Sequence, residues 1–328
     1  MQHGSSDAFG VVAIGRNEGE RLKQCLRSLS AAAQTVYVDS GSTDASVEWA
    51  RAQGMEVVEL DIAAPFTAAR ARNAGFRRLR ELAPQVKYVQ FIDGDCELNQ
   101  TWPTAATAFL HANDGVGAVL GRRRERHPHR SIYNRMCDQE WDVPIGDVFA
   151  CGGDVMMRIS AFEAAGGYRD DLIAGEEPEL CVRLRAAGWK IYRLDHEMSR
   201  HDAAMLRFGQ WWKRQVRSGY AFAQGAQLHG RTPERHWVWE SRRALLWGAG
   251  FPLLSIGALM AFGWWGGLLL LAYPLQMLRR MASMPGSWWS RLQFVFFEQL
   301  SRFPEAVGQL KFARNRLFGH VGRLIEYK

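Results

Sequence analysis

The sequence predicts an α/β protein with a mostly parallel sheet and helices on both faces, followed by a helical region that associates with a membrane. Three observations support this prediction. Strand-like and helix-like segments alternate over residues 10–121, residues 244–278 contain no charged side chain, and basic residues and tryptophans concentrate after residue 200. The 328 residues are 47% hydrophobic and 23% charged, enough for about two domains with a real core.

The alternating segments define the sheet. The expected strands are Val11–Ile14, Thr35–Asp39, Glu56–Leu60, Tyr88–Ile92 and Val116–Leu120. The expected helices between them are Glu20–Leu29, Asp44–Gln53 and Thr67–Leu82. Strands separated by helices of about 10–15 residues pair in parallel and are covered on both faces. Ligands of such sheets bind at the carboxyl ends of the strands.

Several site types are excluded. No GxGxxG follows a strand and no GxxxxGK[ST] occurs, so dinucleotide-binding and P-loop sites are not predicted. A nucleotidyltransferase would need a glycine-rich loop after its first strand, which IGRNEGE does not supply. The five cysteines are scattered without a CxxC pair, which excludes a disulfide framework and a structural zinc site.

Acidic residues follow the strands. Asn17 and Glu18 come after the first strand, Asp39 ends the second, and Asp93 and Asp95 follow the fourth. Two carboxylates separated by one glycine suit Mg²⁺ or Mn²⁺, which could clamp the diphosphate of a nucleotide. The alternative is an ordinary Asp-Gly turn.

A second acidic cluster, Glu176 and Glu177, opens a predicted helix. These acids could cap the helix, or crowding could raise the pKa of one of them into the range of a general base. His201 follows another strand-like segment and could be a metal ligand, a phosphate contact or a surface histidine.

Two further groups of residues are candidates for binding a diphosphate or a sugar. One follows on a probable helix and consists of Gln210, Trp211, Lys213 and Arg214. The two cations could stabilise a departing diphosphate and Trp211 could stack on a sugar, or the helix could simply be amphipathic. The other is the loop containing Gly153 and Asp154, where glycine permits close approach of the backbone.

The uncharged segment 244–278 predicts a membrane hairpin. One straight helix of this length would measure about 50 Å, whereas the hydrocarbon core is roughly 30 Å thick. Glycines and tryptophans at 263–267 interrupt it, and the basic pairs 242–243 and 279–280 flank it. The positive-inside rule then places both ends on the cytoplasmic side. The alternative is a hairpin buried in a soluble core.

The region after the hairpin is basic and aromatic. Residues 201–328 hold 17 Lys and Arg against 6 Asp and Glu, and nine of the 13 tryptophans. This pattern favours interfacial helices over residues 287–328, and no recognition motif accompanies it that would indicate nucleic acid. The basic run at residues 122–135 favours a mobile loop that contacts the acceptor or the membrane, and the alternative is a solvated charged segment.

In order and spacing, the segments between Gly10 and about Gly225 resemble the family 2 glycosyltransferases of GT-A fold, a Rossmann-like architecture. The segments are VVAIGRNEGERLKQCLRSL, VYVDSGSTDAS, ARARNAG, YVQFIDGDCEL, ACGGDVMMRISAFEAAGGY and GEEPELCVRLRAAGW. The apolar hairpin and the closing NRLFGHVGRLIEYK look like bacterial members that build exopolysaccharide or lipid-linked glycans.

The resemblance implies transfer of a sugar from a nucleotide-diphosphate donor, a UDP-sugar in many members, with inversion at the anomeric carbon and with Mn²⁺ or Mg²⁺. Asp39 would hold the base and Asp93 would lie near the ribose or sugar. Asn17, Glu18 and Arg72 would lie by the nucleotide donor. Asp95 would bind the metal, and Glu177 would be the catalytic base.

Two departures from the family pattern matter. Many relatives have Glu-Asp where this chain has Glu176-Glu177, so either glutamate could be the base. Processive members carry Gln-x-x-Arg-Trp, whereas here Gln210 is followed by Trp-Trp-Lys-Arg, which favours addition of one or a few sugars.

The expected organisation is a catalytic domain at 1–225, a membrane hairpin at 226–286 and interfacial helices at 287–328. No secretory apolar run occurs near the start, so the catalytic domain is expected at the cytoplasmic face of the inner membrane, acting on a lipid-linked or glycan acceptor. The alternative function is a non-catalytic nucleotide-sugar-binding module, which would be expected to lack the metal or base carboxylates.

Overall fold

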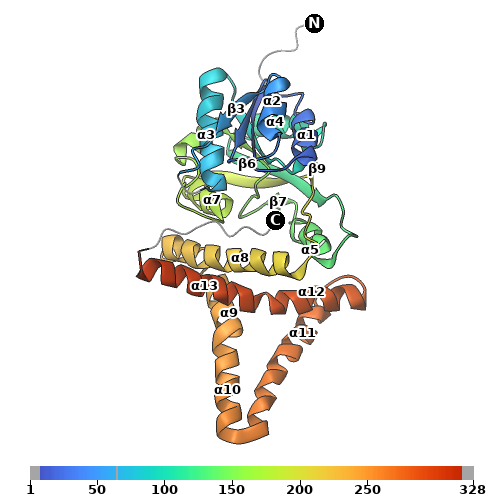
Figure 1. Ribbon diagram of the computed structural model, residues 1–328, viewed down its shortest axis with the longest axis vertical. Helices are drawn as coiled ribbons and strands as arrows, with labels where there is room; N and C mark the ends of the chain where they lie inside the picture. The colour runs from blue at the N-terminus through green and yellow to red at the C-terminus, as the bar shows by residue number, and fades with distance from the viewer. Residues whose placement is uncertain (1–7, 64–65, 320–328) are drawn as a thin grey trace. The chain divides into compact units, whose positions relative to one another are not determined.

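The computed structural model describes residues 8–63 and 66–319, which form two compact units (Figure 1). The division falls between Ala204 and Met205.

The first unit is built on a nine-stranded sheet with the order β3-β2-β1-β4-β8-β6-β9-β5, and β7 pairs with β9. The strands are β1 Phe9–Gly15, β2 Gln34–Asp39, β3 Glu56–Glu59, β4 Tyr88–Asp93, β5 Cys96–Leu98, β6 Val116–Glu125, β7 Gly146–Asp147, β8 Val155–Arg158 and β9 Lys190–His201. The five strands expected from the sequence correspond to β1, β2, β3, β4 and β6.

The four N-terminal strands form the parallel part of the sheet. The rest is mixed, because β8 runs antiparallel to both of its neighbours, β4 and β6. The parallel half agrees with the expectation from the alternating pattern. The direction of a strand as short as Val155–Arg158 could not be predicted from its sequence.

Helices cover both faces of this sheet. They are α1 Glu20–Arg27, α2 Ser46–Ala52, α3 Ala68–Leu82, α4 Trp102–Ala112, α5 Ile132–Glu140, α6 Ile159–Ala164 and α7 Glu176–Ala186. A side chain at Gly75 of α3 would come within 2.4 Å of Val12. Trp102 of α4 donates to Gln90, whose register partner Val11 faces away from Val12. Thus α3 and α4 lie on opposite faces, which confirms the predicted α/β class.

The basic segment 122–135 is not the loop that the sequence analysis favoured. Its first residues continue β6 as far as Glu125, paired in parallel with β9. Its last residues begin α5, which is capped by the Ser131 hydroxyl accepting from the Asn134 amide. The ladder to β9 and this cap satisfy backbone groups that a mobile loop would leave to water.

The second unit is helical: α8 Phe208–His229, α9 Val238–Leu245, a π-helical segment Leu246–Gly250, α10 Phe251–Phe262, a 3₁₀ segment Gly263–Leu271, α11 Ala272–Ala282, α12 Trp288–Leu300 and α13 Arg302–Leu317. Glycines let α8 and α13 approach closely. A side chain at Gly219 would come within 1.9 Å of the Glu305 carbonyl oxygen, and one at Gly308 within 2.0 Å of that of Val216. Since α8 runs past residue 225 and packs on α13, it belongs with the helical unit and the expected domain boundary at 225 falls inside it.

The run Val238–Ala282 is the one stretch of the described residues that is long and apolar enough to cross a membrane. Its chain reverses at Gly263, which has a positive φ of 59° and joins α10 to the returning arm (Figure 1). The arms contact each other, because the Tyr273 hydroxyl donates to the Trp247 carbonyl oxygen at 2.7 Å. The predicted hairpin is therefore present as a fold element. Large apolar side chains on it are exposed, including Leu253, Met260, Phe262, Trp264 and Trp265.

Candidate active site

The carboxyl ends of the parallel strands meet at one edge. Gly15 at the end of β1 pairs with Asp39 of β2, and the preceding Ile14 pairs with Asp93 of β4. The polar residues that the sequence analysis placed after separate strands are therefore neighbours in space.

Asp39 organises the loop that follows β2. Its carboxylate is buried and accepts from the amides of Gly41 and Ser42 at 2.9 and 2.7 Å and from the Tyr37 hydroxyl at 2.8 Å. Asn17 joins this loop to the one after β1, since its side-chain oxygen accepts from the Thr43 amide at 2.7 Å. The two loops thus form one hydrogen-bonded rim.

Glu18 lies on the same rim and pairs with Arg21 at 2.6 Å. The predicted contacts of Asn17, Glu18 and Asp39 with a nucleotide stay predictions.

Arg72 connects three elements through ion pairs. From α3 its Nη2 lies 2.8 Å from Asp93 of β4, and its Nη1 lies 2.9 Å from Glu176 and 3.1 Å from Glu177 of α7. Burial disfavours its charge, but the nearby carboxylates outweigh that effect and hold the pKa of Arg72 well above its usual value. The Arg72 side chain is only 2% exposed, so its charge is balanced by these acids and not by solvent.

The predicted loop glycine lies against this cluster. A β-carbon at Gly153 would come within 2.5 Å of Arg72 Nη2 and 2.6 Å of Asp93 Oδ2. Only a residue without a side chain allows the backbone this approach.

The two glutamates at the start of α7 differ in their surroundings. Glu176 is buried and hydrogen-bonded to Arg72, whereas the Glu177 side chain remains 16% exposed. Burial and the neighbouring charge of Glu176 raise the pKa of Glu177 to about 7, although Arg72 opposes the shift. A carboxyl group with a pKa near the working pH and some access to solvent has the properties of a general base.

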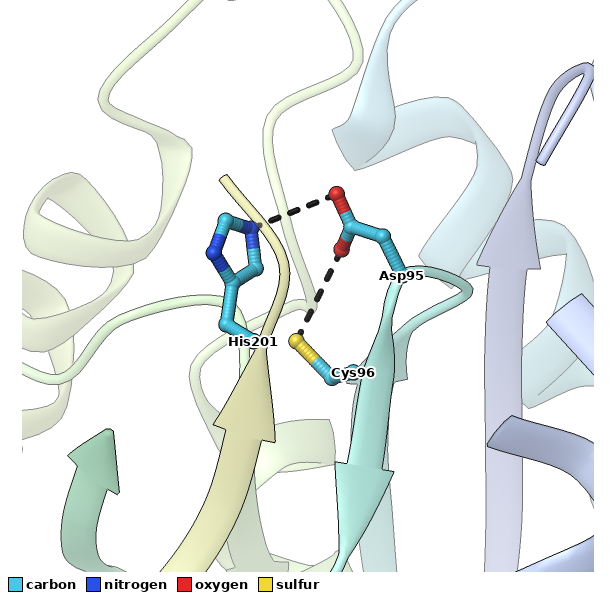
Figure 2. Close-up of side chains that lie close together, drawn as sticks. All are labelled: Asp95, Cys96 and His201. Atoms are coloured by element: carbon cyan, nitrogen blue, oxygen red, sulfur yellow. Dashed lines mark hydrogen bonds and ion pairs between the residues drawn. The ribbon is translucent and has the colours of Figure 1, made fainter. Parts of the chain in front are cut away.

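Asp95 and His201 face each other across adjacent strands, as Figure 2 shows. The antiparallel register places Cys96 opposite His201, and Asp95 Oδ2 lies 3.2 Å from His201 Nε2. Burial and the positive charge of Arg123 lower the pKa of His201, so the imidazole is neutral at pH 7 and has a lone pair available. The structure thus brings the two predicted metal ligands together.

The donor set fits a hard divalent ion. Asp95, Cys96 and His201 offer ligand atoms within 4.8 Å of one another. Burial raises the pKa of the Cys96 thiol well above its usual value, and sulfur is a soft ligand that the hard ions Mn²⁺ and Mg²⁺ do not prefer. A carboxylate oxygen and a neutral imidazole nitrogen remain, and they are compatible with Mn²⁺ or Mg²⁺ completed by water or phosphate oxygens.

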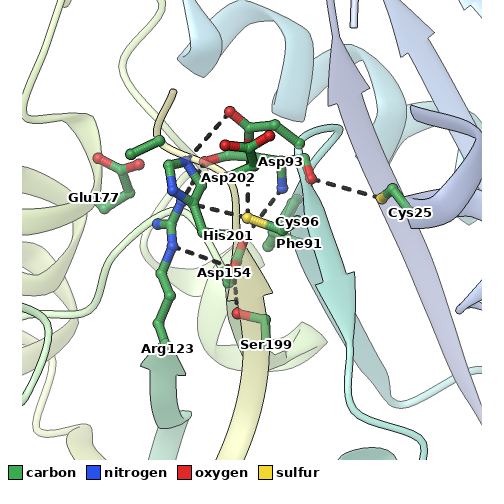
Figure 3. Close-up of polar contacts among 12 residues, drawn as sticks. Cys25, Phe91, Asp93, Cys96, Arg123, Asp154, Glu177, Ser199, His201 and Asp202 are labelled. Atoms are coloured by element: carbon green, nitrogen blue, oxygen red, sulfur yellow. Dashed lines mark hydrogen bonds and ion pairs between the residues drawn. The ribbon is translucent and has the colours of Figure 1, made fainter. Parts of the chain in front are cut away.

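A second network lies beside Asp93 (Figure 3). The predicted Asp154 accepts from the Asp93 amide at 3.1 Å and from the Ser199 hydroxyl at 2.5 Å. Arg123 lies 3.5 Å from both Asp93 and Asp154, and its guanidinium stacks over Trp141 at 4.7 Å. Asp154 therefore positions Asp93 through the backbone.

Sequence reasoning did not single out Arg123. The available signal was alternation: in a strand, Arg123 and Glu125 share a face that differs from that of Arg122 and Arg124. The run of charges indicated solvent exposure instead.

The remaining predicted residues lie on α8 of the second unit. Gln210 caps that helix, accepting from the amides of Leu206 and Arg207 at 2.9 and 3.0 Å. Trp211 is buried, with its ring against Phe208 and Phe297. The role of Trp211 as a sugar-stacking surface is therefore not supported, because core packing uses the ring. Lys213 and Arg214 follow on the same helix, with Lys213 exposed.

Solved structures share this fold. A mannosyltransferase of Pyrobaculum calidifontis, PcManGT in complex with GDP-Man and Mn²⁺, is 19% identical with a TM-score of 0.59, covering 92% of this chain and 86% of that one. TarS residues 1–349 of S. aureus is 14% identical with a TM-score of 0.50, covering 93% of this chain and 92% of that one. The sheet and its acidic edge thus define a protein of GT-A fold.

The sequence of the first unit is similar to a known family. Residues 11–163 match the model of glycosyl transferase family 2. The chain is also 29% identical over 189 residues to the succinoglycan biosynthesis protein ExoA of Rhizobium meliloti (strain 1021), covering 54% of this chain and 55% of ExoA. It thus spans about half the length of this curated relative. Over residues 11–163 the chain is thus similar to a family 2 glycosyltransferase domain.

Proposed function

We propose that this protein is an inverting glycosyltransferase that moves a sugar from a nucleotide-diphosphate donor to an acceptor hydroxyl. The observation that carries the proposal is the arrangement at the acidic edge. Glu177, a carboxyl group with a pKa of about 7, shares the ion-pair partner Arg72 with Asp93. Two residues after Asp93 comes Asp95, which pairs with His201.

In the proposed reaction, Glu177 accepts the proton of the acceptor hydroxyl. The oxygen then forms a bond to the anomeric carbon, the bond from that carbon to the diphosphate oxygen breaks, and the nucleoside diphosphate leaves with the electron pair. One in-line displacement inverts the anomeric carbon. Arg72 orients the base, because its guanidinium contacts Glu177 and Asp93 together.

Asp95 and His201 would hold the divalent ion, which when bound neutralises charge on the leaving diphosphate. Among the two candidate ions, the imidazole nitrogen favours Mn²⁺ over Mg²⁺. Asp39 and the rim around it would bind the base of the nucleotide, as the family resemblance implies.

The family resemblance favours UDP as the nucleotide, and the solved mannosyltransferase is described with GDP-Man and Mn²⁺. Both nucleotides therefore belong in the first test. Calorimetric titration of the detergent-purified protein with UDP and with GDP, in Mn²⁺ and in EDTA, is expected to give binding of one of them that requires the metal.

Turnover in the presence of the matching nucleotide sugar, measured as release of the nucleoside diphosphate, separates an enzyme from a binding module. Metal-dependent binding without release across a panel of sugars and acceptors would favour the non-catalytic alternative. Failure of UDP, GDP and CMP to bind to the folded protein would contradict the donor assignment.

We further propose that the hairpin enters the cytoplasmic membrane and that the acceptor is a lipid-linked or glycan chain at its cytoplasmic face. From Leu245 to Phe262 the outgoing arm is about 27 Å long at helical rise, close to the thickness of the hydrocarbon core. Arginine pairs at 242–243 and 279–280 mark both ends, and the side chains between them are apolar and largely exposed. The role of ExoA in succinoglycan biosynthesis is consistent with a glycan acceptor.

The membrane proposal predicts that the protein floats with vesicles of phosphatidylethanolamine and phosphatidylglycerol. A double substitution, Leu253→Arg with Ile256→Arg, is expected to reduce flotation strongly, because both exposed residues lie near the middle of the arm and each arginine costs about 2.5–3.5 kcal/mol near the bilayer centre. The control is Ile62→Arg, at a comparably exposed apolar residue of the first unit. Equal flotation of wild type and the double variant would contradict insertion.

A further inference from the structure

Behind the His201 imidazole, on the side away from Asp95, lies the buried carboxylate of Glu125. Glu125 ends β6, is 4% exposed, and its Oε2 is 3.6 Å from His201 Nδ1. Among the described residues, that buried Nδ1 has no hydrogen-bond partner within bonding distance. The ring therefore lies between two carboxylates, Asp95 at Nε2 and Glu125 at Nδ1.

Glu125 is held firmly in this place. Its Oε1 accepts from the side-chain amide of Asn134 at 3.1 Å and from the backbone amide of His127 at 3.0 Å. Its Oε2 accepts from the amide of Ala203 at 2.9 Å, two residues beyond the histidine. Asn134 is fully buried on α5, so the carboxylate is tied to three separate segments of the chain.

An irregular pairing of β6 with β9 creates the juxtaposition. Leu120 pairs with Arg193, but after two register shifts Arg123 pairs with Ser199 and Glu125 with His201. Without these shifts, Glu125 would stand opposite Met198. Bulges of this kind re-aim side chains next to functional sites.

We propose that Glu125 is a positioning residue for the metal ligand His201, an inference that rests on the proposed metal site. A small rotation of the ring lets Nδ1–H donate to Glu125 Oε2. That tautomer directs the Nε2 lone pair toward Asp95, where the ion would bind. Carboxylates that accept from the second nitrogen of a ligating histidine fix its orientation and raise its basicity. Glu125 would therefore act on metal affinity without touching the substrate.

The test is the affinity of the full-length protein for Mn²⁺ alone, measured by electron paramagnetic resonance of the free ion. Glu125→Gln keeps the size of the side chain but replaces one carboxylate oxygen by an NH₂ group. That group then faces either the donors of His127 and Asn134 or those of Ala203 and His201. It is expected to weaken Mn²⁺ binding by about 10–100-fold. The matched control is Asp138→Asn, which removes the negative charge that pairs with Arg122 but keeps an oxygen that can accept from the Glu125 backbone amide, and which leaves the group facing His201 unchanged. It is expected to keep the wild-type affinity.

Asp95→Asn separates a failure of the positioning role from a failure of the proposed metal site. Asp95→Asn is expected to abolish Mn²⁺ binding. If it does so while Glu125→Gln binds as wild type does, the positioning role is overturned and the proposed function stands. If all variants bind like wild type, the proposed metal site itself is wrong.

The thermal unfolding midpoint without metal separates positioning from a structural role. If Glu125→Gln does not fold, Glu125→Asp replaces it, because the shorter side chain withdraws the carboxylate from Nδ1. Weaker Mn²⁺ binding at an unchanged midpoint supports the proposal, and wild-type affinity in Glu125→Asp overturns it.

Discussion

Glu177→Gln is expected to lower kcat for sugar transfer by about 10²–10⁴-fold, the usual contribution of a positioned general base. The amide cannot accept the proton of the acceptor hydroxyl, while its size and its ability to accept from Arg72 are kept. The measurement is the initial rate of nucleoside diphosphate release at saturating donor, with the unfolding midpoint as a check on folding. Glu163→Gln, at an exposed ion pair of α6 with Arg80, is the control and should leave kcat unchanged.

The pH profile gives this prediction a second readout. Because the pKa of Glu177 is raised to about 7, its ionised fraction grows with pH up to that value. The kcat of the wild type should therefore rise about tenfold per pH unit below 7 and level off above it, and Glu177→Gln should lose this dependence. A greater loss of kcat in Glu176→Gln, with Glu177→Gln near normal and both folded, would assign the base to Glu176.

Asp95→Asn is expected to remove the metal dependence of nucleotide binding. A neutral amide replaces the carboxylate that faces His201 Nε2, so the charge that attracts the ion is lost. Removing a direct ligand should weaken nucleotide binding in Mn²⁺ by about 100-fold or more, since even outer partners of metal ligands contribute 10–100-fold. Calorimetric titration with the nucleotide in Mn²⁺ and in EDTA measures the affinity with the metal and the affinity without it.

The control for this variant is Asp147→Asn, at an exposed carboxylate that pairs with Lys190. It should behave as wild type does. Metal-dependent binding of normal strength in Asp95→Asn would show that Asp95 is not the metal ligand. The second cluster, Asp93 with Asp154, would then be the next candidate site.

Local sequence patterns predicted the parallel half of the sheet because its strands alternate with amphipathic helices. They also placed Asp39, Asp93 and Asp95 correctly at strand ends, since parallel strands end at one edge. The reversed strand β8 and the bulged pairing of β6 with β9 depend on contacts between distant segments. No local pattern encodes them, and they determine where Arg123 and Glu125 point.

Burial changed the interpretation of individual side chains in the same way. The family resemblance implies that Arg72 lies near a nucleotide, which stays a prediction. The fold adds that acids of α7 and β4 surround this side chain, which only tertiary structure could reveal. Trp211 appeared suited to a sugar by residue type, yet its ring packs against Phe208 and Phe297. An aromatic or charged residue indicates a capacity for binding, and packing decides whether that capacity is available.

The reversal of the chain at Gly263 also bears on how such a protein is made. Both ends of the hairpin leave from the same side, and no charged residue occurs between Ala244 and Leu278. The proposed insertion would therefore move no polar domain and no ionised group across the bilayer, which is the step that normally requires a translocation channel. A finished first unit could be released from the ribosome before the hairpin enters lipid, so folding and membrane delivery need not be coupled in time.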